Sequence, residues 1–152
     1  MINASIEQVA QWSQGELNGT IPTREQGQRI AGVSTDTREN LVGRLFIALV
    51  GKRFDGHQYL EQARQKGARA ALVSSRQPEV DLPQIVVDDT LKALGRLAHQ
   101  WRLWVDPQVV LITGSAGKTT VKQLLAAMLS QKASTVATQG NRNNEIGLPL
   151  TC

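Results

Sequence analysis

The chain has 152 residues, 41% of them hydrophobic, and its 17 Lys and Arg exceed its 13 Asp and Glu to give a formal charge of +4. This apolar content suits a globular protein of one domain or two small ones. The basic residues form no run and few residues are aromatic, which argues against a nucleic-acid-binding protein. No apolar stretch approaches the ~20 residues of a membrane span. The single cysteine, Cys152, excludes an internal disulfide, so we expect a soluble cytoplasmic protein.

The first half of the chain has the pattern of a small α/β domain. Residues 1–15 predict an amphipathic helix in which Ser5 is the N-cap and Gln8, three residues later, completes a capping box. A polar loop follows. A helix is expected over residues 57–66, ended by Gly67. Apolar runs predict four strands, at residues 30–34, 44–50, 68–74 and 84–88.

The second half of the chain predicts a different unit. Asp89 or Thr90 caps a helix whose apolar face extends to Trp104. We assign this helix to a second domain, which gives an N-terminal domain of residues 1–83 and a second domain of residues 84–152. The fold class is therefore α/β, with a small N-terminal α/β domain followed by the start of a parallel-sheet ATPase domain that carries a phosphate loop.

The stretch VVLITGSAGKTT, residues 109–120, is the most informative in the sequence. Aliphatic and β-branched residues predict a buried strand at 109–113, a short loop runs from Gly114 to Gly117, and an amphipathic helix begins at Lys118. Free amides at a helix start bind phosphate, helped by the helix dipole, and glycine lets the phosphate approach. The loop is shorter than the generic pattern. We expect a nucleotide-binding loop, with a plain strand-to-helix turn as the alternative.

Two side chains in this stretch are candidates for a direct part in catalysis. Lys118 can neutralise charge on the β- and γ-phosphates of ATP, and the Thr119 hydroxyl can ligate a Mg²⁺ ion that bridges them. A strand at residues 134–138, after the helix, would complete a βαβ crossover. The predicted ATP-binding residues are Gly114, Ser115, Ala116, Gly117, Lys118, Thr119 and Thr120.

Polar residues gather in three further loops, each at the carboxyl end of a predicted strand, where open α/β sheets place ligands. These loops read STDTR at residues 34–38, GKRFDGH at 51–57 and QGNRNNEIGLP at 139–149. Each has a plainer interpretation as a turn, since aspartate, asparagine and glycine all favour turns. We interpret His57 as a capping or surface residue, because no second histidine, cysteine or carboxylate cluster nearby supports a metal site.

The motifs agree in order and spacing with one family. GSAGKTT, the upstream STDTR with LFIALVGKRFDGH, and the downstream GNRNNEIGLPL resemble the Mur ligase family, which builds the peptide of bacterial peptidoglycan. The resemblance extends from about residue 30 to residue 150. Within the family, the DGH and NNEIG segments look like the member that adds D-alanyl-D-alanine to UDP-N-acetylmuramoyl-tripeptide. The resemblance implies a three-domain cytoplasmic enzyme of cell wall synthesis.

The resemblance also implies roles for the loops. ATP, with Mg²⁺, phosphorylates the substrate carboxylate in this family, and the amine of D-alanyl-D-alanine attacks the acyl phosphate. Thr37 stands where serine is usual, and Ala116 where asparagine or serine is often found. The residues implied around the uridine and diphosphate are Thr35, Thr37, Arg38, Lys52, Arg53 and Phe54, and those implied at the muramoyl-peptide end are Asn141, Asn143 and Asn144.

The family's later Mg²⁺ ligands, its modified lysine, its adenine pocket and its dipeptide-binding domain have no counterpart within the 152 residues. We therefore expect the chain to be a fragment of a longer polypeptide, unable to ligate alone. Three other interpretations stay open. The chain could belong to another Mur ligase, or to a ligase like folylpolyglutamate synthase, which should lack the UDP-binding module. It could also be a non-catalytic nucleotide-binding module.

Overall fold

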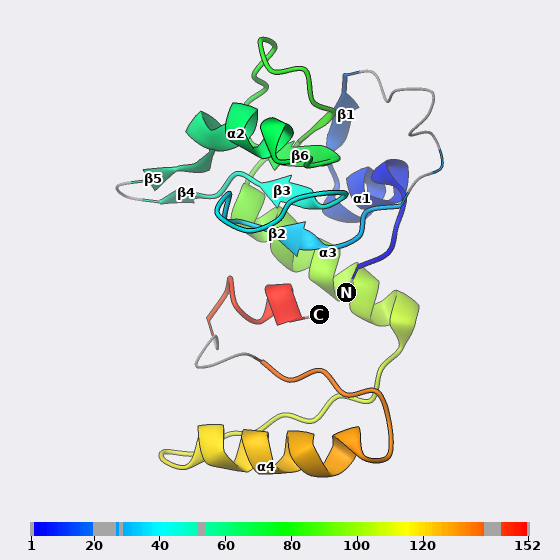
Figure 1. Cartoon of the computed structure of the whole chain (residues 1–152), viewed down its shortest axis with the longest axis vertical. Coiled ribbons are helices and arrows are strands. Elements are labelled where there is room, and N and C mark those ends of the chain that lie inside the picture. The colour runs from blue at the N-terminus through cyan, green and yellow to red at the C-terminus, as the bar shows by residue number, and fades with distance from the viewer. Residues whose placement is uncertain (1, 20–26, 28, 52–53, 139–143, 152) are drawn as a thin grey trace.

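The computed structural model describes residues 2–19, 27, 29–51, 54–138 and 144–151. Its main feature is a five-stranded sheet with the strand order β1-β7-β6-β3-β2 (Figure 1). Strands β2, β3, β6 and β7 are parallel, whereas β1 pairs antiparallel with β7 at one edge. Strands β4 and β5 form a separate antiparallel hairpin. The fold is therefore mixed α/β, and its sheet is mostly parallel, as the sequence predicts.

The strands of the sheet are β1 (Glu16–Asn18), β2 (Val33–Ser34), β3 (Leu45–Ile47), β6 (Ala70–Val73) and β7 (Gln84–Val86). Those of the hairpin are β4 (Val50–Gly51) and β5 (Phe54–Asp55). The helices are α1 (Ile6–Ser13), α2 (Leu60–Gln65), α3 (Thr90–Val105) and α4 (Lys118–Ser130), with short 3₁₀ turns η2 (Gly56–Tyr59) and η3 (Pro149–Thr151). None of the helices in the described part of the chain is long and apolar enough to cross a membrane.

Local sequence signals account for most helix ends. Ser5 accepts a hydrogen bond from the amide of Gln8, and the Gln8 side chain accepts one from the amide of Ser5, so the predicted capping box is confirmed. Asp89 caps α3 by accepting from the amides of Leu91 and Lys92. Both caps satisfy amides that have no partner within the helix, which fixes where each helix begins.

Helices cover both faces of the sheet. Alternate residues of a strand point to opposite faces, and β3 shows this well, since Leu45 and Ile47 pack with α1 and α3 while Phe46 packs with α2. The two hydrophobic cores that result are fully buried at their centres. The sheet is thus the middle layer of three, and its loops are held by packing on both sides.

Three predictions about strands are wrong. Residues 16–18 were expected to be loop but form β1, which pairs with β7 and has no local sequence signal. Residues 109–113 and 134–138 were expected to be strands but have no strand assignment, and Leu111 is 88% exposed. A strand needs a neighbour to hydrogen-bond its backbone. Among the described residues, none of the strands pairs with either segment.

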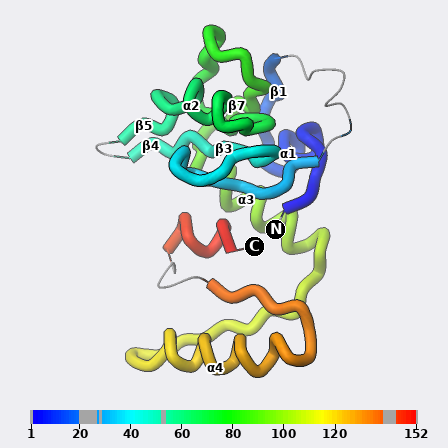
Figure 2. The backbone as a smooth tube through the Cα atoms, in the orientation of Figure 1, coloured from blue at the N-terminus to red at the C-terminus, as the bar shows by residue number. Residues whose placement is uncertain are grey.

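The packing of β7 and α3 bears on the domain boundary, which the sequence places between residues 83 and 84. β7 lies between β6 and β1 in the sheet. Ala93, Leu94 and Leu97 of α3 are buried in the same core as α1. We therefore propose that the first domain extends through α3 and that the boundary follows Val105. Figure 1 shows α4 at the end of the molecule away from the sheet, and Figure 2 shows residues 146–151 between them.

Gly95, inside α3, offers a test of this helix packing. A methyl group added there would meet no atom within 4 Å beyond the adjoining backbone of its own helix, and glycine in a helix costs about 0.5–1 kcal/mol relative to alanine. We expect Gly95→Ala to raise the free energy of unfolding by about that amount, measured as a higher urea midpoint at constant slope. Gly67→Ala is the control and should be destabilising, because Gly67 has a φ of +83° and lies against Val42. A Gly95→Ala variant less stable than the parent would contradict the helix environment described here.

Candidate functional site

The phosphate loop has the backbone geometry that the sequence predicts for an anion site, although the strand before it is absent. Gly117 is the N-cap of α4 with a φ of 76°, and Gly114 has a φ of 147°. Both values lie in a region that side chains rarely adopt, which explains the glycines. The four loop residues, 114–117, are exposed. The first amides of α4 are therefore open to a ligand from solvent.

Lys118 and Thr119 occupy the first turn of α4. The Lys118 ammonium group donates a hydrogen bond to the carbonyl oxygen of Gly114, so its side chain folds back over the loop. Lys118 is half-buried, whereas Thr119 and Thr120 are exposed. The structure thus brings a cation, free amides and two hydroxyl groups together at one helix start, which is the set of groups that binds a polyphosphate.

A second group of predicted residues lies at the carboxyl edge of the sheet. Residues 35–38 follow β2, and Phe54 belongs to the hairpin that follows β3, the neighbouring strand. Thr35 is half-buried, and Thr37 is buried and donates from its hydroxyl to the side-chain carbonyl of Gln62 at 2.7 Å. The sheet therefore brings these loops side by side, whereas the phosphate loop lies with α4 (Figure 1).

Arg38 forms a two-pronged pair with Asp36 in the same loop. The guanidinium donates from Nε and Nη2 to the carboxylate, with a shortest distance of 2.6 Å. The hydrogen bonds from the Arg38 side chain and then its amide lower the pKa of Asp36 to about 2. The pair is therefore intact at neutral pH and is lost only as the pH falls from about 4 through 2. Since Arg38 is 88% exposed, the guanidinium keeps a free face toward solvent.

Further polar contacts hold this loop in place, and they are only partly buried. Ser34 donates to the carboxylate of Glu39 at 2.8 Å, and Arg44 donates to the same oxygen at 3.2 Å. Gln62, the partner of Thr37, was not identified from the sequence as a site residue. It lies on α2, 25 positions away, and an exposed glutamine on a short helix carries no sequence signal for such a contact.

The structure describes only some of the remaining predicted site residues. Phe54 is 48% exposed, and its ring stacks on that of Tyr59 with centroids 5.4 Å apart. Lys52, Arg53, Asn141 and Asn143 lie outside the described residues. The side-chain oxygen Oδ1 of Asn144 accepts a hydrogen bond from the amide of Gly147, which makes a turn. Asn144 itself is exposed.

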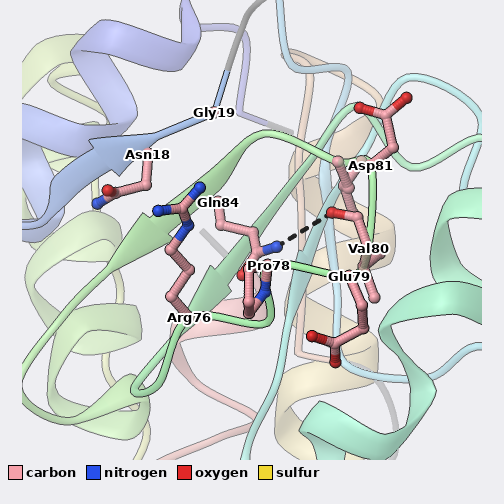
Figure 3. Close-up of a pocket in the computed structure, with 9 residues that line it drawn as sticks. Asn18, Gly19, Arg76, Pro78, Glu79, Val80, Asp81 and Gln84 are labelled. Atoms are coloured by element: carbon pink, nitrogen blue, oxygen red, sulfur yellow. Dashed lines mark hydrogen bonds between the residues drawn. The ribbon is translucent and has the colours of Figure 1, made fainter.

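A depression of about 250 Å³ lies away from all of these groups, between the end of β1 and residues 76–84 (Figure 3). Its floor includes Gln84, which is 3% exposed. The Gln84 amide group bonds the backbone of Gln77 twice and that of Val80 once. These bonds use the Gln84 side chain to hold the loop of residues 77–80 in place, so the amide group is already satisfied within the protein.

Residues 29–102 match the Mur ligase family, catalytic domain, and residues 112–152 match the Mur ligase middle domain. The two matches together span most of the chain. The chain belongs to the Mur ligase family. The interval between the two matches begins within α3 and includes the residues after Val105, where we propose the boundary between the two domains of this Mur ligase chain.

The relatives are similar over almost the whole chain. The UDP-N-acetylmuramoyl-tripeptide–D-alanyl-D-alanine ligase of Escherichia coli is 46% identical over 99% of this chain, and that of Bacillus subtilis is 42% identical over 99%. A crystal structure of MurF from Acinetobacter baumannii has a TM-score of 0.86 at 36% identity, again over 99%. MurF from Thermotoga maritima in complex with ADP has a TM-score of 0.67 over 78%.

These matches also show a difference in length. The chain spans 32% of the Escherichia coli ligase, 33% of the Bacillus subtilis ligase and 32% of the Acinetobacter baumannii MurF chain. The Thermotoga maritima chain is covered to 28%. The similarity therefore shows a MurF-like Mur ligase sequence over about a third of its relatives' length.

Proposed function

We propose that this chain is the substrate-binding and phosphate-binding part of an ATP-dependent ligase that adds D-alanyl-D-alanine to UDP-N-acetylmuramoyl-tripeptide. The observation that carries the proposal is the 46% identity over 99% of the chain to a ligase of that name. The loop at the start of α4 supports the use of ATP, because its amides are open to solvent and the Lys118 side chain folds back over it. A relative in complex with ADP supports the same ligand class.

In this proposal the residues of α4 act on the phosphates. ATP supplies the phosphoryl group that activates the substrate carboxylate. The loop amides at residues 114–118 hold the phosphates, and Lys118 moves from the Gly114 carbonyl to the phosphate oxygens, where its charge offsets the negative charge that develops during transfer. Because the loop itself is exposed, exclusion of water depends on groups beyond these residues.

The residues also fit a limited role for Mg²⁺. Thr119 offers one exposed hydroxyl oxygen beside the phosphate loop. Within the described residues, no group of three histidines, cysteines or carboxylates could hold a metal ion. A Mg²⁺ ion typically keeps several waters and takes one or two protein ligands besides phosphate oxygens, so a single hydroxyl is compatible with it. The Mg²⁺ ion would neutralise charge on the phosphates.

The carboxyl edge of the sheet is assigned to the UDP end of the substrate. Arg38 presents a free guanidinium face, and Phe54 presents an exposed aromatic ring, on loops from neighbouring strands. Guanidinium groups suit phosphate oxygens, and aromatic faces suit bases. Thr35, Thr37, Lys52 and Arg53 are proposed to complete this site, and Asn141, Asn143 and Asn144 are proposed to face the peptide end.

A second candidate is a Mur ligase that adds a different amine. The UDP-N-acetylmuramoyl-L-alanyl-D-glutamate–2,6-diaminopimelate ligase of Aquifex aeolicus is 39% identical over 67% of this chain. The two activities differ in both the acceptor peptide and the amine. A ligase like folylpolyglutamate synthase and a non-catalytic module remain the more distant alternatives.

The test is ADP release by the intact polypeptide that contains this chain. We expect release with UDP-N-acetylmuramoyl-tripeptide and D-alanyl-D-alanine together, and only background release when either is left out. Release with UDP-N-acetylmuramoyl-dipeptide and diaminopimelate instead would favour the second candidate. Release dependent on a folate and glutamate would favour the synthase, and no release with any pair would overturn the ligase assignment.

A further inference from the structure

The His57 side chain is buried and holds two separate parts of the fold together, a role that its interpretation as a capping or surface residue did not include. Its side chain is 8% exposed. The Nδ1 atom lies 2.6 Å from Oδ1 of Asp55, and the Nε2 atom lies 3.0 Å from the main-chain nitrogen of Ser74. The first contact is local, whereas the second spans 17 residues.

These contacts select one tautomer of the imidazole. The Ser74 amide can only donate, so Nε2 must be the unprotonated, accepting nitrogen. The proton is then on Nδ1, which donates to the Asp55 carboxylate. The hydrogen bonds from the His57 amide and then from its ring lower the pKa of Asp55, so this acceptor is ionised at neutral pH. The hydrogen bonds to Asp55 and from the Ser74 amide therefore require the tautomer that has its proton on Nδ1.

The arrangement has the order of a hydrolytic triad but not its chemistry. The Ser74 hydroxyl lies 3.3 Å from Nε2, and Asp55 lies on the other side of the ring. A general base needs a free lone pair on Nε2 to take the hydroxyl proton. That lone pair is already shared with the Ser74 amide. The contact therefore holds the chain in place and does not activate Ser74.

The hydrogen bonds of His57 join the β4–β5 hairpin to the carboxyl edge of the sheet. Asp55 is the last residue of β5, and Ser74 follows β6, the strand beside β3. Gly56 donates from its amide to the carbonyl of Leu49 at 2.8 Å, which closes the base of the hairpin. Gly56 also packs against the backbone of Ala48, the residue that follows β3, since a Cβ atom at Gly56 would lie 2.8 Å from the Ala48 Cα. His57 supplies the second anchor, on the next strand. Two anchors on neighbouring strands determine the direction in which the hairpin points.

We propose that His57 is a positioning residue for binding of the UDP-containing substrate. It orients the β4–β5 hairpin, and with it the exposed Phe54 ring stacked on Tyr59, through its bond with the Ser74 amide. This inference rests on the proposed function, because it assumes that the hairpin contacts that substrate. The imidazole itself touches no reacting atom.

Two substitutions separate the two bonds. The amide group of His57→Asn can occupy the position of Nδ1 and keep the Asp55 contact, but it is too short to reach Ser74. The longer His57→Gln places an acceptor near the position of Nε2 and keeps the Ser74 contact. His99→Asn is the matched control, because His99 is the other histidine of the chain and is exposed on α3.

The experiment measures kcat and the two KM values of the intact ligase, with circular dichroism to verify folding. We expect His57→Asn to raise KM for the UDP-containing substrate about tenfold, the effect of one hydrogen bond, with kcat and KM for ATP unchanged. His57→Gln should restore most of the loss, and His99→Asn should match the parent. An unchanged KM in His57→Asn, or equal loss in both variants, would overturn the positioning role. An inactive parent enzyme would instead overturn the proposed function.

Discussion

Replacing Lys118 with alanine is expected to lower kcat of the intact ligase by about 10²-fold or more. The ammonium group lies over the phosphate loop, on the Gly114 carbonyl, and is the described cation closest along the chain to the open amides of α4. Removal of one preorganised group that stabilises developing charge costs about 10²–10³ in rate. Stability should change little, because the lost contact is a single exposed hydrogen bond. ADP release under saturating substrates measures the effect.

Lys132→Ala is the matched control for the loss of one positive charge. Lys132 follows the other end of α4 and is exposed. If charge on this helix attracted the nucleotide only through the general field, both variants would lose activity alike and both losses would shrink with salt. We expect loss in Lys118→Ala alone. Equal activities in the parent and the Lys118→Ala enzyme would remove the phosphate loop from the mechanism.

The elements predicted well are those whose signal is local. The Ser5 and Gln8 capping box and the Asp89 cap are satisfied within three residues, so the sequence alone determines them. The helix at α4 begins at Lys118, as its apolar period predicts. β1 was missed because its three residues become a strand only through pairing with β7, about 70 residues later. Such a partner leaves no trace in the composition of the segment.

The apolar run at residues 109–113 shows the opposite error. Its composition is that of a buried strand, but Val109, Val110 and Leu111 are 53%, 58% and 88% exposed. On α4, Leu124 and Met128 are likewise 61% and 68% exposed. The apolar pattern indicates which surfaces are suited to burial. A strand also requires a neighbouring strand that hydrogen-bonds to its backbone. Within the described residues, the sheet does not supply that neighbour.

The positions of the candidate site residues along the fold could be predicted from the sequence, whereas the contacts that hold them could not, and their roles stay predictions. The sequence placed residues 34–38 and 51–57 after two predicted strands, and the structure adds that these strands, β2 and β3, are neighbours in the sheet. The contacts that hold these loops come from residues far along the chain, such as Gln62 for Thr37 and Ser74 for His57. A single sequence gives the residue types but not these distant pairs.

Substituting Gly56 with alanine is expected to be the most destabilising single methyl addition in the hairpin region. A Cβ atom at Gly56 would lie 2.8 Å from Cα and 2.9 Å from the carbonyl carbon of Ala48, and 2.9 Å from the Leu49 nitrogen. These atoms are backbone of the chain leaving β3, and Ala48 is fully buried, so no side chain can rotate away. Overpacking of this kind costs about 1–3 kcal/mol or more.

The effect should appear as a lower thermal midpoint, by about 2–4 °C for each kcal/mol in a chain of this size. Gly51→Ala is the control within the same hairpin, because its nearest neighbour is the Phe54 carbonyl at 3.9 Å and there is room for a methyl group. Since Gly56 also holds the hairpin base against Ala48, the surviving folded Gly56→Ala enzyme should show a raised KM for the UDP-containing substrate. A Gly56→Ala midpoint equal to that of Gly51→Ala would mean that the hairpin base is not packed against β3 as described, and the positioning role of His57 would lose its first anchor.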